Sequence, residues 1–177
     1  MEQRLLDVCG TSDRLALLLS GGKVHRYHQD GQPQSVGEHT WRMLVLLLHF
    51  WPLASRAMVL AALYHDVAER YTGDIPNPVK RHNPQVAEAV KEMERDFHDH
   101  LHIPTASELT VEDQARLRCA DYLELCITCK ERHGRRARQI YERGAELVEE
   151  YAATLPLNEQ AEILSFVGEL STGNWEP

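Results

Sequence analysis

The chain has 177 residues, of which 43% are hydrophobic and 26% are charged, and its formal net charge is -8. This length and hydrophobic content predict one domain over residues 1–177 that buries about two thirds of its unfolded surface. The negative charge argues against binding to a nucleic-acid polymer or an anionic membrane, and no apolar stretch approaches the ~20 residues that span a bilayer.

The spacing of hydrophobic residues predicts helix in nearly every segment of the chain. A first helix near residues 12–20 ends at Gly21 and Gly22, and a polar loop with Arg26 and Tyr27 follows. Further helices are expected near residues 36–49, 54–70, 84–101, 111–132, 135–153 and 158–170. Because no strand-period run is long enough to predict a sheet, we expect an all-α bundle of about six to seven helices.

Two helix starts place chemically useful side chains. Ser35 and Glu38 have the spacing of a capping box, which puts His39 in a first helical turn. Asp121 falls inside the long amphipathic helix whose start is signalled by Thr110. Each has a plain alternative, since a histidine at a helix start or an acid on a long helix is often solvated.

The most informative feature is the sequence His65-Asp66 at the end of an apolar run, with Glu69 four positions after the histidine. Imidazole nitrogens and carboxylate oxygens both bind borderline divalent metals. If this segment continues as helix, residues i and i+4 lie on one face, so Glu69 points where His65 points. The pattern predicts a metal site with its own acid–base group, although a lone histidine in such a place is usually a hydrogen-bonded core residue.

Two side chains do not complete a metal shell, and His39 and Asp121 are the candidates that would. Together with His65 and Asp66 they make a site of two imidazoles and two carboxylates with room for water. We expect this site to bind one divalent transition metal, with zinc, cobalt or manganese as the first candidates.

The order of these four residues resembles the H…HD…D ligand order of the HD-domain metal phosphohydrolases. Within that superfamily, residues 63–80 (LYHDVAERYTGDIPNPVK) are similar to the bacterial 5'-deoxynucleotidases and the related phage dATP triphosphohydrolases. The resemblance covers roughly residues 24–130. It implies an HD-domain helical bundle.

The resemblance also implies roles for five further residues. Glu69 matches the residue that activates or positions the attacking water, and Asp74 matches an acid beside the sugar that favours 2'-deoxynucleotides. Arg26 matches a phosphate contact, and Lys80 is a plausible second one. Tyr27 stands where the family has Trp, over the sugar or base.

From this resemblance we expect hydrolysis of the 5'-phosphoester of a 2'-deoxynucleotide. Monophosphates would release phosphate, and dATP would release triphosphate. The compact length and the basic run 130–138 slightly favour the triphosphate, because a polyphosphate needs more cations. The plain interpretation of that run is a solvated junction between helices. The alternative function is a non-catalytic nucleotide-sensing or interaction module, against which Glu69 and Asp74 speak.

The expected partners and location complete the prediction. Members of the family assemble as oligomers, so we expect a homo-oligomer. The first residues lack the basic and apolar segments of a signal peptide, and four scattered cysteines suit a reducing compartment. These features predict a cytoplasmic protein, in the host cytoplasm if it is encoded by a phage.

Two other groups of residues contain side chains that can bind metals or take part in redox chemistry. His98, His100 and His102 lie near a helix end, and a second metal site is the less favoured interpretation. Cys126 and Cys129 form a lone C-x-x-C motif inside a predicted helix, where packing is the better interpretation than redox chemistry.

Overall fold

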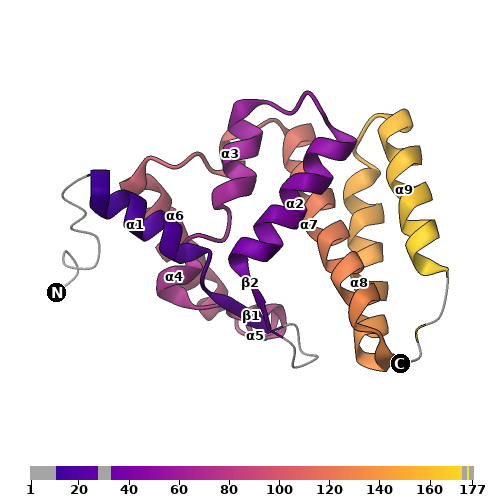
Figure 1. Ribbon diagram of the computed structural model, residues 1–177, viewed down its shortest axis with the longest axis horizontal. Coiled ribbons are helices and arrows are strands. Elements are labelled where there is room, and N and C mark those ends of the chain that lie inside the picture. Colours follow the sequence, from indigo (N-terminus) through magenta and orange to yellow (C-terminus); the bar gives the residue numbers. More distant parts are fainter. Residues whose placement is uncertain (1–10, 28–32, 173–174, 176–177) are drawn as a thin grey trace. The chain divides into compact units, whose positions relative to one another are not determined.

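The computed structural model describes residues 11–27, 33–172 and 175, and helices account for most of them (Figure 1). The α-helices of the described part are α1 (Thr11–Gly21), α2 (Val36–Phe50), α3 (Arg56–Tyr64), α4 (Glu69–Thr72), α5 (Asn77–His82), α6 (Pro84–Leu101), α7 (Val111–Arg132), α8 (Gly134–Ala152) and α9 (Leu157–Ser171). A short 3-10 helix (Ala106–Glu108) precedes α7. The prediction of an all-α fold is confirmed, with α4 and α5 as short helices that the sequence did not indicate.

The chain forms two compact units, and neither is continuous in sequence. The first unit comprises the described residues up to Thr40 together with Leu63–Thr105. The second unit comprises Trp41–Ala62 and the described residues from Ala106 onward. Within α2 the chain therefore passes from the first unit to the second. A single domain over residues 1–177 stays a prediction.

The first unit contains a small hairpin that the sequence did not predict. Strand β1 (His25–Tyr27) pairs with β2 (Pro33–Ser35) in antiparallel register, and Arg26 lies opposite Gln34. Strands of three residues are too short to show the alternation of period two on which such a prediction depends.

The first unit has its own small hydrophobic core beneath α6. Buried residues of α6 pack against residues that follow α3 and against α1. The members of this core are Val67, Ala68, Phe97, Leu101 and Ile103, with Leu17, Leu18 and Tyr64 packed against them. This core holds the segment between α3 and α4 in place.

One helix prediction is wrong. The helix expected over 54–70 ends at Tyr64, and four residues in turn conformation separate it from α4. No glycine or proline marks this break in the sequence, so local pattern could not reveal it. The helix ends at Tyr64 because its carbonyl oxygen accepts hydrogen bonds from Val67 and His98, which both lie outside α3.

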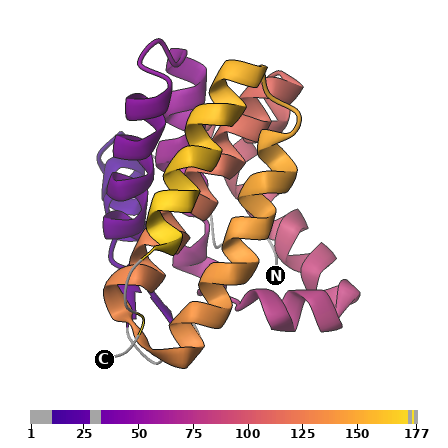
Figure 2. The same cartoon turned by 90° about the vertical axis from the view of Figure 1, so that its right-hand side faces the viewer.

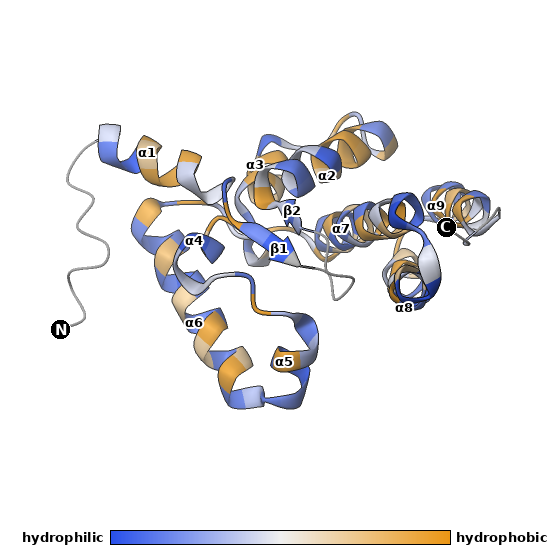
Figure 3. Cartoon of the chain, turned by 60° about the horizontal axis from the view of Figure 1, so that its bottom comes forward, coloured by the Kyte–Doolittle hydropathy of each residue, from blue (hydrophilic) through white to orange (hydrophobic). Residues whose placement is uncertain are grey.

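The second unit is built on the antiparallel helices α7, α8 and α9. Figures 1 and 2 both show α8 running beside α9, and α7 packs against α8 and α9. Figure 3 shows hydrophobic and hydrophilic residues around each of these helices, as expected for amphipathic helices that share a core. The largest fully buried apolar side chains of this unit are those of Leu47, Met58, Leu123, Val148 and Ile163.

The C-x-x-C motif lies in this packed interior. Cys126 and Cys129 are both fully buried in α7, and burial raises the pKa of the Cys126 thiol. A Cβ at Gly144 of α8 would lie 3.1 Å from Cys126 Sγ, so α7 and α8 are in close contact here. The packing interpretation is confirmed. Among the described helices, none is long and apolar enough to cross a membrane.

Candidate metal centre

His39 lies near the start of α2, as the capping pattern predicts. The Oγ atom of Ser35 accepts a hydrogen bond of 3.0 Å from the backbone N–H of Glu38. This bond satisfies one of the amides that a helix start leaves without a partner. The imidazole of His39 is only 1% exposed, so the solvated alternative for this residue is wrong.

His65 and Asp66 lie on a tight turn and not in a helix. The carbonyl of Tyr64 accepts a 3.1 Å hydrogen bond from the N–H of Val67, which leaves the two residues at the centre of the turn. Consecutive residues of a helix point about 100° apart. Here the Nε2 atom of His65 lies 3.1 Å from Oδ2 of Asp66. The turn thus brings neighbouring side chains to one point.

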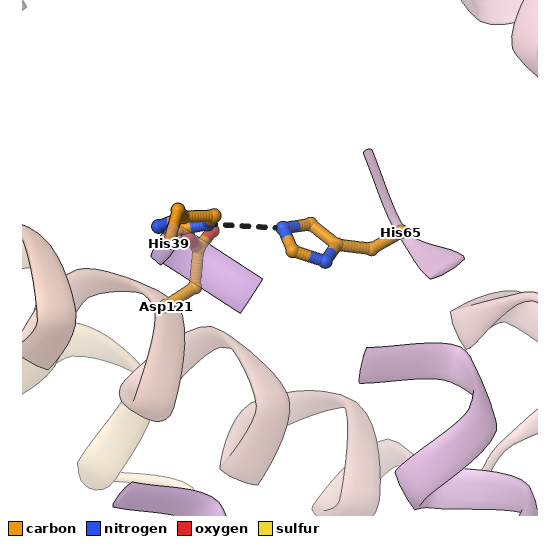
Figure 4. Close-up of side chains that lie close together, drawn as sticks. All are labelled: His39, His65 and Asp121. Carbon is orange, nitrogen blue, oxygen red and sulfur yellow. Dashed lines mark hydrogen bonds between the residues drawn. The ribbon is translucent and has the colours of Figure 1, made fainter. Parts of the chain in front are cut away.

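Three ligand atoms of the first unit converge. The Nε2 atoms of His39 and His65 lie 3.1 Å apart, and Figure 4 shows the two rings with this hydrogen bond. Oδ2 of Asp66 lies 3.7 Å from Nε2 of His39. Two imidazole nitrogens and a carboxylate oxygen at such separations are a donor set that suits zinc, cobalt or manganese. The residues present therefore fit the expected metal.

Asp121, the other side chain drawn in Figure 4, belongs to the second unit. It lies inside α7, as predicted, and its side chain is partly buried, with Nη1 of Arg118 3.8 Å from Oδ2. Its role as a metal ligand stays a prediction.

Arg26 contacts a candidate ligand. Nη1 of Arg26, on β1, lies 2.9 Å from Oδ2 of Asp66, and both side chains are largely buried. Burial alone would raise the pKa of Asp66, but His65 and Arg26 outweigh it and hold that pKa well below its usual range. Asp66 is therefore ionised at neutral pH, as a ligand must be.

Glu69, the first residue of α4, is the second carboxylate of this group. Its side chain is buried, and Oε2 accepts no hydrogen bond from any residue that the structure describes. Burial, and after it the negative charge of Asp66, raise the pKa of Glu69 to about 8. A carboxyl with a pKa near neutrality can both take up and release a proton in that pH range.

Asp74 and Lys80 lie close enough to act on Glu69 electrostatically. The charge of Asp74 raises the pKa of Glu69, and that of Lys80 lowers it. Asp74 follows Gly73, whose φ of 68° lies in the left-handed region and turns the chain after α4. Lys80 lies on the short helix α5. The side chain of Tyr27 lies outside the described part of the structure.

His98 has a role that the sequence did not reveal. It is buried in α6, and its Nε2 lies 3.2 Å from the carbonyl oxygen of Tyr64. His100 and His102 are exposed, and no group that could hold a metal includes any of these three histidines among the described residues. The available signal was the position of His98 one turn before Leu101, within the apolar stripe of α6.

Comparison with known proteins identifies the family of this chain. The family described as "5'-deoxynucleotidase YfbR-like" matches residues 27–170. This chain belongs to that family. Membership in the YfbR-like family confirms the resemblance to bacterial 5'-deoxynucleotidases that the sequence indicated.

Curated relatives match the chain over a short segment. A 5'-deoxynucleotidase of Pasteurella multocida is 43% identical over 44 residues, which are 25% of this chain and 23% of the relative. A 5'-deoxynucleotidase of Yersinia pestis is 44% identical over 43 residues, 24% of this chain and 22% of the relative. The aligned segment thus spans less than a quarter of the length of these relatives.

Solved structures share the fold of this YfbR-like chain. The HD phosphohydrolase DatZ of cyanophage S-2L, solved with dA and one catalytic Zn²⁺ ion, gives a TM-score of 0.71 at 21% identity, covering 87% of this chain and 94% of DatZ. The PH0347 protein of Pyrococcus horikoshii gives 0.67 at 18% identity, covering 90% of this chain and 99% of PH0347. These matches confirm the HD-type helical fold.

Proposed function

We propose that this chain hydrolyses the 5'-phosphoester of 2'-deoxynucleotides with the help of one divalent metal. The observation that carries the proposal is the convergence of His39, His65 and Asp66 in the first unit, with the buried carboxyl of Glu69 beside them. Membership in the YfbR-like 5'-deoxynucleotidase family supports the same activity.

The proposed metal ligands are His39, His65, Asp66 and Asp121, with zinc, cobalt or manganese as the metal. The 3.1 Å separation of the His39 and His65 Nε2 atoms supports the two imidazoles as ligands, and Asp121 is included because of the resemblance of the sequence to the HD-domain ligand order. The one catalytic Zn²⁺ of the cyanophage protein supports a single metal. A bound divalent ion would neutralise phosphate charge and lower the pKa of a water molecule.

The remaining chemistry falls to the chain's own side chains. Glu69 accepts the proton of the attacking water, for which its shifted pKa is well suited. Arg26 offers a planar fork of N–H donors that matches a phosphate, and it lies beside Asp66, where a substrate phosphate would have to bind. Lys80 adds a second positive charge.

Asp74 and Tyr27 are the proposed sugar contacts. A carboxylate packed closely against the 2' carbon would leave no space for the additional hydroxyl of a ribonucleotide and would select against it by steric exclusion. Tyr27, on β1, would cover the sugar or base. A homo-oligomer and a cytoplasmic location complete the proposal.

The leaving group separates two forms of the activity, and we favour phosphate over triphosphate. The family name supports monophosphate substrates, whereas the sequence alone slightly favoured dATP because of the basic run 130–138. In that run, Lys130 donates a 2.9 Å hydrogen bond to the carbonyl of Thr172 and lies over the Trp175 ring, and Arg138 pairs with Glu142. These contacts give the run a structural role within the second unit.

Product analysis by chromatography tests the proposal. Cobalt-loaded protein is incubated separately with dAMP, dATP, the other deoxynucleoside monophosphates and AMP. Deoxynucleoside and phosphate from the deoxynucleoside monophosphates, with little turnover of AMP, is the expected result. Deoxyadenosine and triphosphate from dATP alone would assign the triphosphohydrolase form. Metal binding without turnover of any nucleotide would favour the sensing module instead.

A further inference from the structure

His98 reaches from α6 to the end of α3. Its imidazole is 8% exposed, and Nε2 lies 3.2 Å from the carbonyl oxygen of Tyr64, 34 residues earlier in the chain. Because a carbonyl oxygen can only accept, Nε2 must carry the hydrogen. Burial lowers the pKa of His98, which keeps the ring neutral at pH 7. The imidazole of His98 is therefore a neutral hydrogen-bond donor that is held at a defined place.

The carbonyl that His98 binds is the one that closes the His65-Asp66 turn. The oxygen of Tyr64 also accepts the 3.1 Å hydrogen bond from the N–H of Val67. Two donors on one carbonyl use both of its lone pairs and fix its direction. Since a helical continuation of α3 would need this oxygen for residue 68, the two bonds also explain why the helix ends at Tyr64.

The turn is held on its other side by α1. A Cβ at Gly21 would lie 2.7 Å from Cγ2 of Val67, so only glycine lets α1 approach this closely. On the α6 side, Phe97 belongs to the buried core that includes Val67, and its ring also packs against Tyr71 of α4 with ring centroids 5.3 Å apart. The turn is thus fixed between two helices, and His98 makes a directional contact with it.

We propose that His98 is a positioning residue that fixes the His65-Asp66 turn through the carbonyl of Tyr64, so that both side chains are oriented for the metal. The inference rests on the proposed function, because it assigns these residues as ligands. It adds a residue from α6 to a site whose ligands lie on other elements. Outer partners that orient ligands are typically worth about 10- to 100-fold in metal affinity.

The test compares three variants by their affinity for Co²⁺, measured by competition with a chelator. His98→Leu removes the donor, whereas His98→Gln keeps an N–H group at about the distance of Nε2. Phe97→Leu is the control, because it weakens the same core and leaves the imidazole that binds the Tyr64 carbonyl in place. We expect affinity to fall about 10- to 100-fold in His98→Leu and to change less than about 3-fold in the other two.

A second readout follows the turn without metal. Amide hydrogen exchange at Val67, recorded by NMR, should be faster in His98→Leu than in Phe97→Leu at equal free energy of unfolding. The proposal is overturned if His98→Leu and Phe97→Leu lose affinity equally, since His98 would then only fill the core. It is also overturned if His98→Gln loses as much as His98→Leu. Failure of the unmodified protein to bind Co²⁺ would instead reject the proposed function itself.

Discussion

Asp66 and Glu69 are two carboxylates three positions apart whose pKa values are shifted in opposite directions. Arg26 and His65 lie against Asp66 and keep it ionised, whereas burial beside that negative charge raises the pKa of Glu69 to about 8. Two acids with separated pKa values can take two roles, one as a ligand and one as a proton acceptor. The different environments of the two carboxylates, more than their residue types, determine which is the ligand and which is the proton acceptor.

The first prediction concerns Glu69. Glu69→Gln keeps the size of the side chain and removes the proton acceptor, so it should leave Co²⁺ affinity within about 3-fold while lowering kcat by about 100-fold or more. Metal titration and steady-state kinetics with dAMP measure the two effects separately. Glu88→Gln, an exposed position on α6, is the matched control and should behave as the unmodified protein does. A near-normal rate in Glu69→Gln would remove Glu69 from its role.

The second prediction concerns Arg26. Arg26→Lys keeps the positive charge but loses the planar fork, so it should raise the KM for dAMP more than it lowers metal affinity. Steady-state kinetics and cobalt titration provide the two values. Loss of metal affinity with an unchanged KM would show that Arg26 serves Asp66 and does not contact substrate.

At the scale of elements, the start of α2 carries His39. Ser35→Ala removes the acceptor for the N–H of Glu38 and should cost about 1 kcal/mol in the free energy of unfolding. Urea unfolding measures this cost. Ser35→Thr keeps the hydroxyl and should recover most of it. Equal stability of the alanine and threonine variants would mean that this cap does not stabilise α2.

Glu159 connects α9 to α7 and to Trp51, the residue that follows α2. At the start of α9, it accepts hydrogen bonds from Nε1 of Trp51 at 2.6 Å and from Nε and Nη2 of Arg116 at 2.9 Å each. The hydrogen bonds from Arg116 lower the pKa of Glu159, although partial burial opposes them. A lowered folded-state pKa gives stability that is present above the unfolded value and is lost as the pH falls through the folded value.

A prediction follows for Glu159→Gln. The variant should lose about 1.5–3 kcal/mol in the free energy of unfolding at pH 7, where the carboxylate is charged. The difference from the unmodified protein should shrink at acidic pH, once the native carboxyl takes up its proton. Urea unfolding at pH 7 and at about pH 3 measures both values. A difference that does not depend on pH would show that the charge of Glu159 contributes nothing.

At the scale of the whole molecule, the features that depend on residues close together in the sequence could be predicted from its pattern. The capping residues placed His39, and the His-Asp pair with its surrounding segment indicated the family. The end of α3 could not be predicted, because the second donor to the Tyr64 carbonyl comes from His98, 34 residues away. The β1–β2 hairpin was missed because its strands are too short to show a period.

The proposed ligands come from both units, so metal binding should stabilise both of them against local opening. If Asp121 of the second unit joins His39, His65 and Asp66, metal binding should slow amide exchange in both units, for example in α6 and in α8. Asp121→Asn should keep protection of the first unit only, at higher metal concentration. Protection confined to the first unit in the unmodified protein would exclude Asp121 as a ligand.

The most direct test of the account is the release of deoxyadenosine from dAMP during a metal titration of protein that has been treated with a chelator. A single metal site with a water-activating carboxylate predicts no release without metal and a linear rise that ends at one equivalent of cobalt or zinc. Release by the metal-free protein, or none at any metal concentration, would contradict the assignment of this chain as a metal-dependent deoxynucleotide phosphohydrolase.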